Sequence, residues 1–214
     1  TAVHVSVAEA GDTGKAIKTT NVDSVKAELE AKGYEVIAPT DPAYTTDRVA
    51  FYAESNRTFD DKDDKGNDGI SQVYYVIVKE GITPIDPDKP LDPNNPNTTP
   101  KPGDKVPGDP KQRTFEQLGL LDEVNRTINY RYANTDKVEE AKRGQEAAAT
   151  VEQKLRYSRK GDLNKVTGEI TYTSDWTAPQ TLAEVTSPVI DGYVADIKAA
   201  EKVENVAHDA ADSV

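Results

Sequence analysis

The acidic run from Phe59 to Gly69 contains the side chains of this chain that best match a metal site. Asp61, Asp63, Gly66 and Asn67 fall near the positions of a calcium-binding loop. Lys65 stands at the fifth position of such a loop, however, and Gln72 stands at the twelfth, where a bidentate Glu is needed. The flanking residues also have the pattern of strands, not of the two helices that enclose an EF-hand loop. Two interpretations remain, a solvated loop between strands and a weak calcium site.

The two histidines do not form a recognisable catalytic arrangement. His4 lies in an alternating apolar and polar stretch, and His208 lies in a polar stretch near the end of the sequence. Neither has a Ser or Asp at a motif spacing, and the chain contains no nucleophile elbow and no glycine-rich phosphate loop. There is no cysteine to supply a thiolate or a zinc ligand. We therefore expect no enzymatic activity, and we assign no catalytic and no metal-binding residue.

The aromatic residues are the remaining candidates for a binding surface. Ten of them are Tyr, and Trp176 is the only Trp. Exposed Tyr and Trp suit carbohydrate or protein ligands because they combine apolar area with a polar tip. The alternative is that they pack across strands, which applies to Tyr130, Tyr132, Tyr157 and Tyr172. The ligand-binding residues stay unassigned at this stage.

The elements that must position these residues begin with a mixed α and β pattern. Alternating valines predict a strand at 2–7, and a second short strand is expected at 16–19. A helix follows, capped by Thr20 or Asn21 and ended by Gly33, with a Glu28–Lys32 pair on its surface. Further strands are expected at 34–37, 48–53 and 72–79. This order suggests a β-grasp, the ubiquitin-like arrangement.

The sequence after residue 111 is mostly strand-like. Alternation predicts strands at 126–132, 151–159 and 168–174. A hairpin turn is expected at Thr167–Gly168. The segment 134–149 has helical propensity but no clean apolar stripe, so we expect a loop with at most a helical turn.

A proline-rich segment separates these two parts. Nine of the thirteen prolines lie between Ile82 and Pro110. Proline lacks a backbone N–H, so the segment can form neither a helix nor a central strand. It also has little apolar surface to bury. We therefore predict a semi-stiff extended spacer, with a module at 1–83, a linker at 84–111 and a second module at 112–214.

Charge and hydropathy exclude several partners. The formal net charge is −12, and an acidic surface repels nucleic acid and anionic membranes. The sequence has no run of 18 apolar residues and no signal-peptide pattern at its start. We expect that any targeting signal or anchor lies outside this segment.

A series of short motifs between Val124 and Asp196 resembles the C-terminal half of the mucus-binding (Mub) repeat of lactobacillal surface adhesins. The matching elements are Arg126–Tyr130, Val151–Arg159, Val166–Gly168, Trp176–Thr177, Pro179–Leu182, Val185–Pro188 and Asp191–Tyr193. The first module is similar to the N-terminal, MucBP-like half of such a repeat. Its matching elements are Phe59–Asp68, Val73–Lys79 and Gly81–Pro84. The segment 134–149 is longer and more charged than the family's usual turn.

The resemblance implies an α+β, β-rich fold with two β-grasp modules in an elongated arrangement. It implies a wall-anchored, extracellular protein of a Gram-positive bacterium that binds mucin glycoproteins through their glycans. Each copy is expected to be a monomer within a tandem array, and no cofactor is expected apart from the calcium interpretation of 59–69. Two alternatives stay open, a structural stalk repeat and an immunoglobulin-binding module that works by strand addition.

Overall fold

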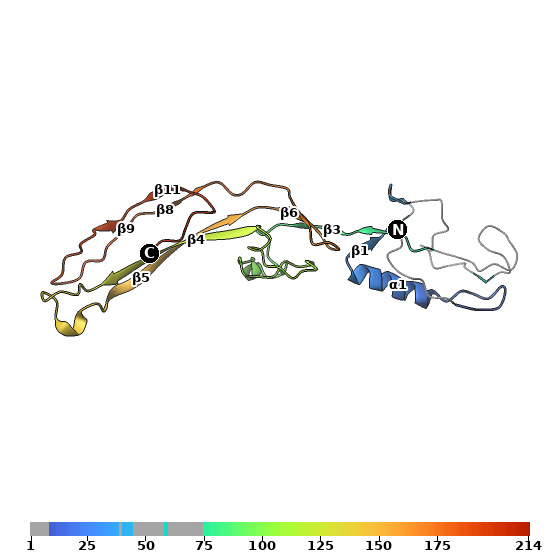
Figure 1. The fold of residues 1–214 in the computed structure, drawn as a ribbon, viewed down its shortest axis with the longest axis horizontal. Coiled ribbons are helices and arrows are strands. Elements are labelled where there is room, and N and C mark those ends of the chain that lie inside the picture. Colours follow the sequence, from blue (N-terminus) through green and yellow to red (C-terminus); the bar gives the residue numbers. More distant parts are fainter. Residues whose placement is uncertain (1–8, 39, 45–57, 60–74) are drawn as a thin grey trace. The chain divides into compact units, whose positions relative to one another are not determined.

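The computed structural model describes residues 9–38, 40–44, 58–59 and 75–214, and within them the chain is strand-rich with few helices (Figure 1). The predicted strands at 2–7 and 48–53 lie outside the described residues, as do His4 and nearly all of the acidic run. No helix in the described part is long and apolar enough to cross a membrane. The chain forms two compact units. One comprises 1–84, 107–112 and 162–170, and the other comprises 85–106, 113–161 and 171–214.

The first unit contains α1, the helix Thr19–Ala31. It confirms the helix predicted from the apolar spacing, and Leu29 on its apolar face is 2% exposed. The Glu28 and Lys32 side chains pair at 2.7 Å on its surface. Gly33 ends the helix with a φ of +92°, a conformation that glycine adopts without strain.

The start of α1 differs from the expectation in two ways. The cap predicted at Thr20 or Asn21 is wrong, because both residues lie inside the helix and the extended Lys18 precedes it without a side-chain cap. The Lys18 N–H instead donates to Glu9 Oε1 at 3.0 Å. The short strand expected at 16–19 is reduced to a single bridge between Ala16 and Thr58, since the helix takes the residues that follow.

Glycines allow three backbone segments of this unit to approach closely. Strand β1 (Tyr34–Val36) pairs antiparallel with β2 (Val78–Glu80). Just beyond this pairing, the Gly81 N–H donates to the Gly33 carbonyl at 2.9 Å and the Lys165 N–H donates to the Gly81 carbonyl at 2.8 Å. A Cβ at Gly33 would lie 2.3 Å from the Lys165 carbonyl oxygen. Only glycine leaves room for this junction.

A three-stranded sheet follows, in the order β3-β6-β7. Its strands are β3 (Ile82–Ile85), β6 (Gly161–Asn164) and β7 (Ile170–Tyr172). The hairpin turn predicted at Thr167–Gly168 connects β6 to β7, and Gly168 has a φ of +74° there. The Asn164 N–H donates to the Glu169 carbonyl at 2.8 Å and closes the turn.

The second unit is built on one long hairpin. Strands β4 (Leu121–Arg131) and β5 (Glu146–Ser158) pair antiparallel along their length, with irregular register near Tyr130 (Figure 1). The loop between them contains one turn of 3-10 helix, η2 (Glu140–Lys142), as the helical propensity of this stretch predicted. Strand β5 starts earlier than the strand predicted at 151–159, however, because it already includes Glu146–Ala149.

Four short strands return along this hairpin. They are β8 (Gln180–Leu182), which pairs with β11 (Val203–Val206), and β9 (Val185–Thr186), which pairs with β10 (Ala199–Ala200). The core between the hairpin and these strands is formed by Val124, Tyr157, Leu182 and Val206. The Tyr157 hydroxyl donates to the carbonyl of Val206, so even this buried ring has its polar group paired.

Arg126 joins the returning strands to the hairpin. It is 8% exposed, and its guanidinium donates to Gln153 Oε1 at 2.7 Å, to the Glu201 carbonyl at 2.7 Å and to the Ala183 carbonyl at 2.5 Å. Those two carbonyls lie where the chain passes from β8 to β9 and from β10 to β11. One buried cation therefore holds three separate segments together.

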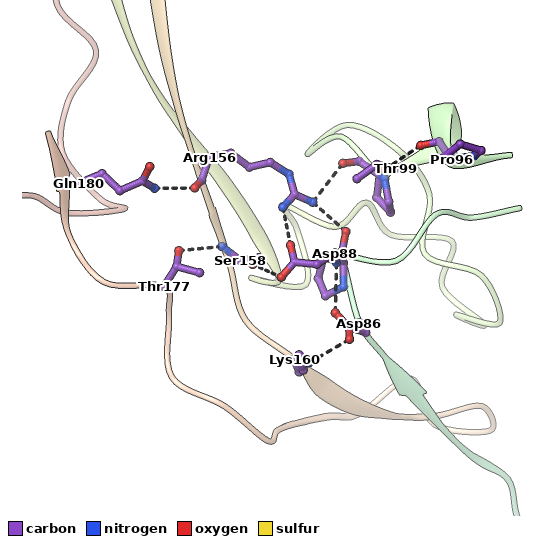
Figure 2. Close-up of polar contacts among 11 residues, drawn as sticks. Asp86, Asp88, Pro96, Thr99, Arg156, Ser158, Lys160, Thr177 and Gln180 are labelled. Atoms are coloured by element: carbon purple, nitrogen blue, oxygen red, sulfur yellow. Dashed lines mark hydrogen bonds and ion pairs between the residues drawn. The ribbon is translucent and has the colours of Figure 1, made fainter. Parts of the chain in front are cut away.

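The proline-rich segment is not an extended spacer, and that expectation is wrong. Residues 85–106 belong to the second unit and form turns and a short 3-10 helix, η1 (Pro96–Thr98). The residues that hold the segment come from one face of β5 and its continuation (Figure 2). Arg156 donates to Asp88 Oδ1 at 2.5 Å and to the Pro87 carbonyl at 2.7 Å. Ser158 Oγ donates to Asp88 Oδ2 at 3.0 Å.

The segment packs on β5 because prolines prevent it from forming an α-helix or a central strand but do not prevent contacts with a neighbouring strand. A proline carbonyl remains a good acceptor, and Pro87 and Pro100 are buried. The aspartates between the prolines supply carboxylates for cations on β5 and just after it, such as Lys160, which pairs with Asp86 at 3.0 Å. Composition therefore predicted the lack of an α-helix and of a central strand in this segment but not these partners.

Replacing Arg126 with Ala should lower the free energy of unfolding by about 2–4 kcal/mol, because hydrogen bonds from a buried charged donor contribute about 1.5–3 kcal/mol each. Chemical denaturation measures the loss. Arg131→Ala is the matched control, since Arg131 is exposed and makes one bond, to the Gly144 carbonyl at 3.2 Å. Its expected loss is within about 0.5 kcal/mol, and equal losses for the two variants would contradict the role of Arg126.

Acid should weaken the docking of the proline-rich segment. Burial raises the pKa of Asp86, but hydrogen bonds from Lys160 and from the Asp88 N–H outweigh it and lower the pKa below 3.8. A depressed carboxyl pKa adds stability that is present above the unfolded pKa and lost as the pH falls through the folded pKa. Asp86→Asn should therefore show a smaller fall in thermal midpoint between pH 5 and about pH 2 than the unmodified protein. Parallel curves would refute this contribution.

Candidate functional site

A stack of four side chains lies where the second unit's segments meet, and we call it the Arg159 stack. Its members are Tyr172, Arg159, Trp176 and His208. They come from the end of β7, the residue after β5, the loop before β8 and the segment after β11. Residues far apart in the sequence thus form one continuous surface feature.

Arg159 occupies the centre of the stack. Its guanidinium carbon lies 3.3 Å from the ring centroid of Tyr172 and 4.6 Å from that of Trp176, which are cation–π distances. Its Nε donates to the Gly119 carbonyl at 2.6 Å. Among the described residues no carboxylate forms an ion pair with Arg159. Its guanidinium instead contacts two aromatic faces and one backbone carbonyl.

Gly119 forms the floor below this pair. Its φ is +64°, and a Cβ there would lie 2.8 Å from the Tyr172 hydroxyl and 2.9 Å from Arg159 Nη2. The Tyr172 hydroxyl donates to the neighbouring Leu118 carbonyl at 2.7 Å. The turn at 118–119 therefore fixes the tip of the tyrosine and the base of the arginine at once.

His208 closes the other end of the stack. Its ring lies on Trp176 with centroids 4.3 Å apart and planes 17° apart. Its Nδ1 lies 3.3 Å from Asp122 Oδ2, a carboxylate on β4. Both histidine and aspartate are partly exposed, so the end of the stack is polar and accessible.

The stack has the chemistry of a binding surface. Tyr172 is 42% exposed, and a partly exposed aromatic ring with adjacent N–H donors suits the apolar face and hydroxyls of a sugar, or a protein surface. No group of three or more potential ligands in the described part could hold a metal ion. The calcium interpretation of 59–69 falls outside that part and stays a prediction.

The aromatic residues weighed from the sequence have different environments. Tyr157 is a buried core residue. Tyr132 packs edge-to-face on Tyr193, with centroids 4.8 Å apart. Only Tyr172 and Trp176 join the stack. Both alternatives for the aromatic residues therefore apply: Tyr157 and Tyr132 pack against other side chains, whereas Tyr172 is exposed.

No pattern in the sequence indicates the other half of the stack, Arg159 and His208. Arg159 belongs to the alternating pattern that predicts a strand at 151–159, and His208 lies in a polar stretch. The sequence signal that could have drawn attention to Arg159 is its place at the end of an alternating strand pattern. Nothing local to His208 indicates Trp176, which is 32 positions earlier in the numbering of the chain.

Comparison with known proteins matches part of the chain to a domain family. Residues 116–214, which contain the whole stack, match the Muc B2-like domain. No protein with curated annotation matches the chain. The similar structures named below are described as mucus-binding or mucin-binding repeats and domains, not as enzymes. The match covers just under half of the chain, and it confirms the resemblance seen in the sequence for this part.

Several solved structures are similar to the chain. The type 2 repeat of the mucus binding protein MUB from Lactobacillus reuteri is 20% identical, with 96% of this chain and 85% of that chain covered and a TM-score of 0.41. The mucin-binding domain of Spr1345 from Streptococcus pneumoniae is 33% identical, covering 44% and 83%, with a TM-score of 0.35. The MucBP domain of LBA1460 from Lactobacillus acidophilus is 25% identical, covering 44% and 87%, with a TM-score of 0.32.

Removing His208 should change the environment of the only tryptophan. In His208→Ala one face of Trp176 loses its stacked ring and gains water, so the fluorescence emission should shift to longer wavelength. The matched control is Asp209→Ala, because Asp209 is the exposed neighbour of His208 and should leave the emission unchanged. An unshifted spectrum in a folded His208→Ala variant would show that His208 does not cover Trp176.

Proposed function

We propose that this chain is a non-catalytic repeat of a bacterial cell-surface adhesin that binds mucin glycoproteins through their glycans and mediates adhesion to host mucus. The match of residues 116–214 to the Muc B2-like domain is the observation that carries the proposal. The names of the similar structures, which describe mucus and mucin binding, support it. Such a repeat acts outside the cell, on a protein anchored to the wall of a Gram-positive bacterium.

The proposed architecture has two β-grasp modules, at 1–83 and 112–214, with the proline-rich residues 84–111 between them. Support comes from α1 followed directly by β1, which pairs antiparallel with β2. In this arrangement the proline-rich residues act as a docked connector. Repetition of such units raises the avidity of a surface protein, so each copy can bind weakly.

The Arg159 stack is the proposed glycan contact. A pyranose ring presents an apolar face of C–H groups that packs on an exposed aromatic ring, and its hydroxyls accept from a guanidinium. Arg159 is already held in place by Tyr172, Trp176 and the Gly119 carbonyl, so little side-chain freedom is lost on binding. A preformed surface of this kind suits shallow contact with a glycan that recurs along the mucin chain.

No cofactor has a part in this proposal. A weak calcium site within 59–69 remains the alternative to a solvated loop. Its test is the thermal midpoint of the chain with and without a chelator, because a ligand that binds only the native state raises that midpoint.

The deciding experiment is binding of the chain to immobilised mucin, to the same mucin after deglycosylation and to immunoglobulin. Saturable binding to mucin that is lost on deglycosylation is expected. Binding to immunoglobulin alone would move the function to protein recognition. Binding to none of the three surfaces, with tandem copies equally inert, would make the repeat a stalk.

Variants of the stack should separate binding from folding. Tyr172→Ala and Arg159→Gln should each weaken mucin binding about tenfold or more, as expected for a residue that contributes over 1 kcal/mol. Tyr193→Ala and Arg131→Gln are the matched controls, since they remove the same residue types outside the stack. If the controls weaken binding as much as the stack variants, with all thermal midpoints alike, the glycan contact lies elsewhere.

A further inference from the structure

The loop between β9 and β10 is closed at its base, and we call its residues 187–198 the Tyr193 loop. The two strands pair with each other directly before and after it. The Ser187 N–H donates to the Lys198 carbonyl at 2.9 Å, and the Ser187 hydroxyl donates to the Ile197 carbonyl at 2.7 Å. These bonds continue the pairing of the strands into the loop, so the two ends of the loop are held together.

The middle of the Tyr193 loop is anchored on the loop between β4 and β5, and the two loops lie beside each other (Figure 1). The Tyr193 ring packs edge-to-face on Tyr132, with centroids 4.8 Å apart. Lys142 Nζ lies 5.9 Å from the centroid of the Tyr193 ring and pairs with Glu139 at 2.9 Å. The Tyr193 N–H donates to the Ile190 carbonyl at 3.0 Å and closes a turn. The loop is therefore fixed at its middle as well as at its ends.

The aliphatic residues of the Tyr193 loop are exposed. Val189 is 99% exposed, Val194 is 94% exposed and Ile197 is 64% exposed. Three such side chains within nine positions differ from the singly scattered apolar residues of an ordinary protein surface. Because the hydrogen bonds and the packed tyrosine hold the loop in this conformation, these side chains stay in water unless another molecule covers them.

The residue types of the Tyr193 loop indicate the chemistry of that molecule. Sugars pack on aromatic rings, but the single aromatic residue of the loop already packs on Tyr132, and branched aliphatic side chains suit an apolar protein surface. Asp191 and Asp196 lie among the aliphatic residues, and no Lys or Arg occurs within 187–197. Asp191 forms no ion pair within the described part of the chain. The complementary surface is therefore apolar and bordered by cations.

We propose that the Tyr193 loop is a docking site for a basic partner protein that presents an apolar surface bordered by Lys or Arg side chains. The aliphatic residues of the loop pack on that surface, and its two aspartates face the cations. A second copy of the chain or an anionic membrane fits poorly, because the formal net charge of −12 repels both. The loop is already fixed, so docking loses little conformational entropy. This inference does not depend on the proposed mucin binding.

The test measures binding of the chain to a fluorescent helical peptide of Leu and Lys, in which Lys residues border a face of Leu residues. Fluorescence anisotropy gives the dissociation constant. The loop variant carries three substitutions together, Val189→Ser, Val194→Ser and Ile197→Ser. It should bind the peptide about tenfold or more weakly, because it keeps the charge of the loop and loses its apolar contacts.

The matched control also removes three exposed aliphatic side chains, but outside the loop. It carries Ile82→Ser, Leu91→Ser and Val203→Ser. The control should bind the peptide like the unmodified chain, with all thermal midpoints alike. Equal weakening in the loop variant and the control, or no binding of the peptide to the unmodified chain up to about 1 mM, would overturn the proposal.

The contribution of charge is tested with a second peptide and two single variants. A peptide with Glu in place of every Lys should bind the unmodified chain at least about tenfold more weakly, and equal binding of the two peptides would rule out a basic partner. Asp191→Asn should weaken binding of the Lys peptide about two- to fivefold. Asp209→Asn removes the same charge from an exposed position outside the loop and should have no effect. Equal effects would mean that the peptide responds to net charge and not to the loop.

Two further measurements separate the other occupants from a basic protein. Analytical ultracentrifugation of the chain alone detects self-association, and flotation with phosphatidylcholine vesicles detects membrane binding. Either one, if present in the unmodified chain and abolished in the loop variant, would overturn the proposal in favour of a second copy or a lipid surface. The loop variant should bind mucin like the unmodified chain, so failure of the proposed mucin binding and failure of the docking site are observed separately.

Discussion

A buried arginine without a carboxylate partner is the constraint on which the second unit depends. A charged group at the Arg126 position must satisfy its N–H donors or destabilise the fold, and it does so with Gln153 and two backbone carbonyls. Carbonyls free to accept occur where the strands are interrupted, so the corners at Ala183 and Glu201 must lie over β4. That placement sets the core between Val124, Tyr157, Leu182 and Val206.

The two faces of β5 have different tasks because side chains alternate along a strand. Leu155 and Tyr157 face the core, whereas Arg156 and Ser158 face the proline-rich segment. The residue after the strand, Arg159, enters the stack of aromatic rings. A single short stretch of sequence thus packs a core, docks a segment that cannot form its own sheet, and presents a cation at the candidate binding surface.

The side chains of the candidate site pack against one another, and this packing both holds them in place and limits the ring surface that they expose. Each member of the Arg159 stack is positioned by a neighbour, from Gly119 below Tyr172 to Asp122 beside His208. Such preorganisation lowers the entropy cost of binding, but a stack packed against itself exposes only part of each ring. Weak contact multiplied over many copies is the mode of binding that this geometry favours.

The sequence by itself determined the local features whose cause lies within a few residues. These are the helix ended by Gly33, the alternating strands β4 and β5, the turn at Thr167–Gly168 and the absence of an α-helix and of a central strand from the proline-rich stretch. The motif series also identified the family. Tertiary structure alone decided which residues meet. Docking of Asp88 on Arg156 and the meeting of Arg159, Trp176 and His208 depend on contacts between distant segments. Periodicity carries no information about which distant partner a side chain will find.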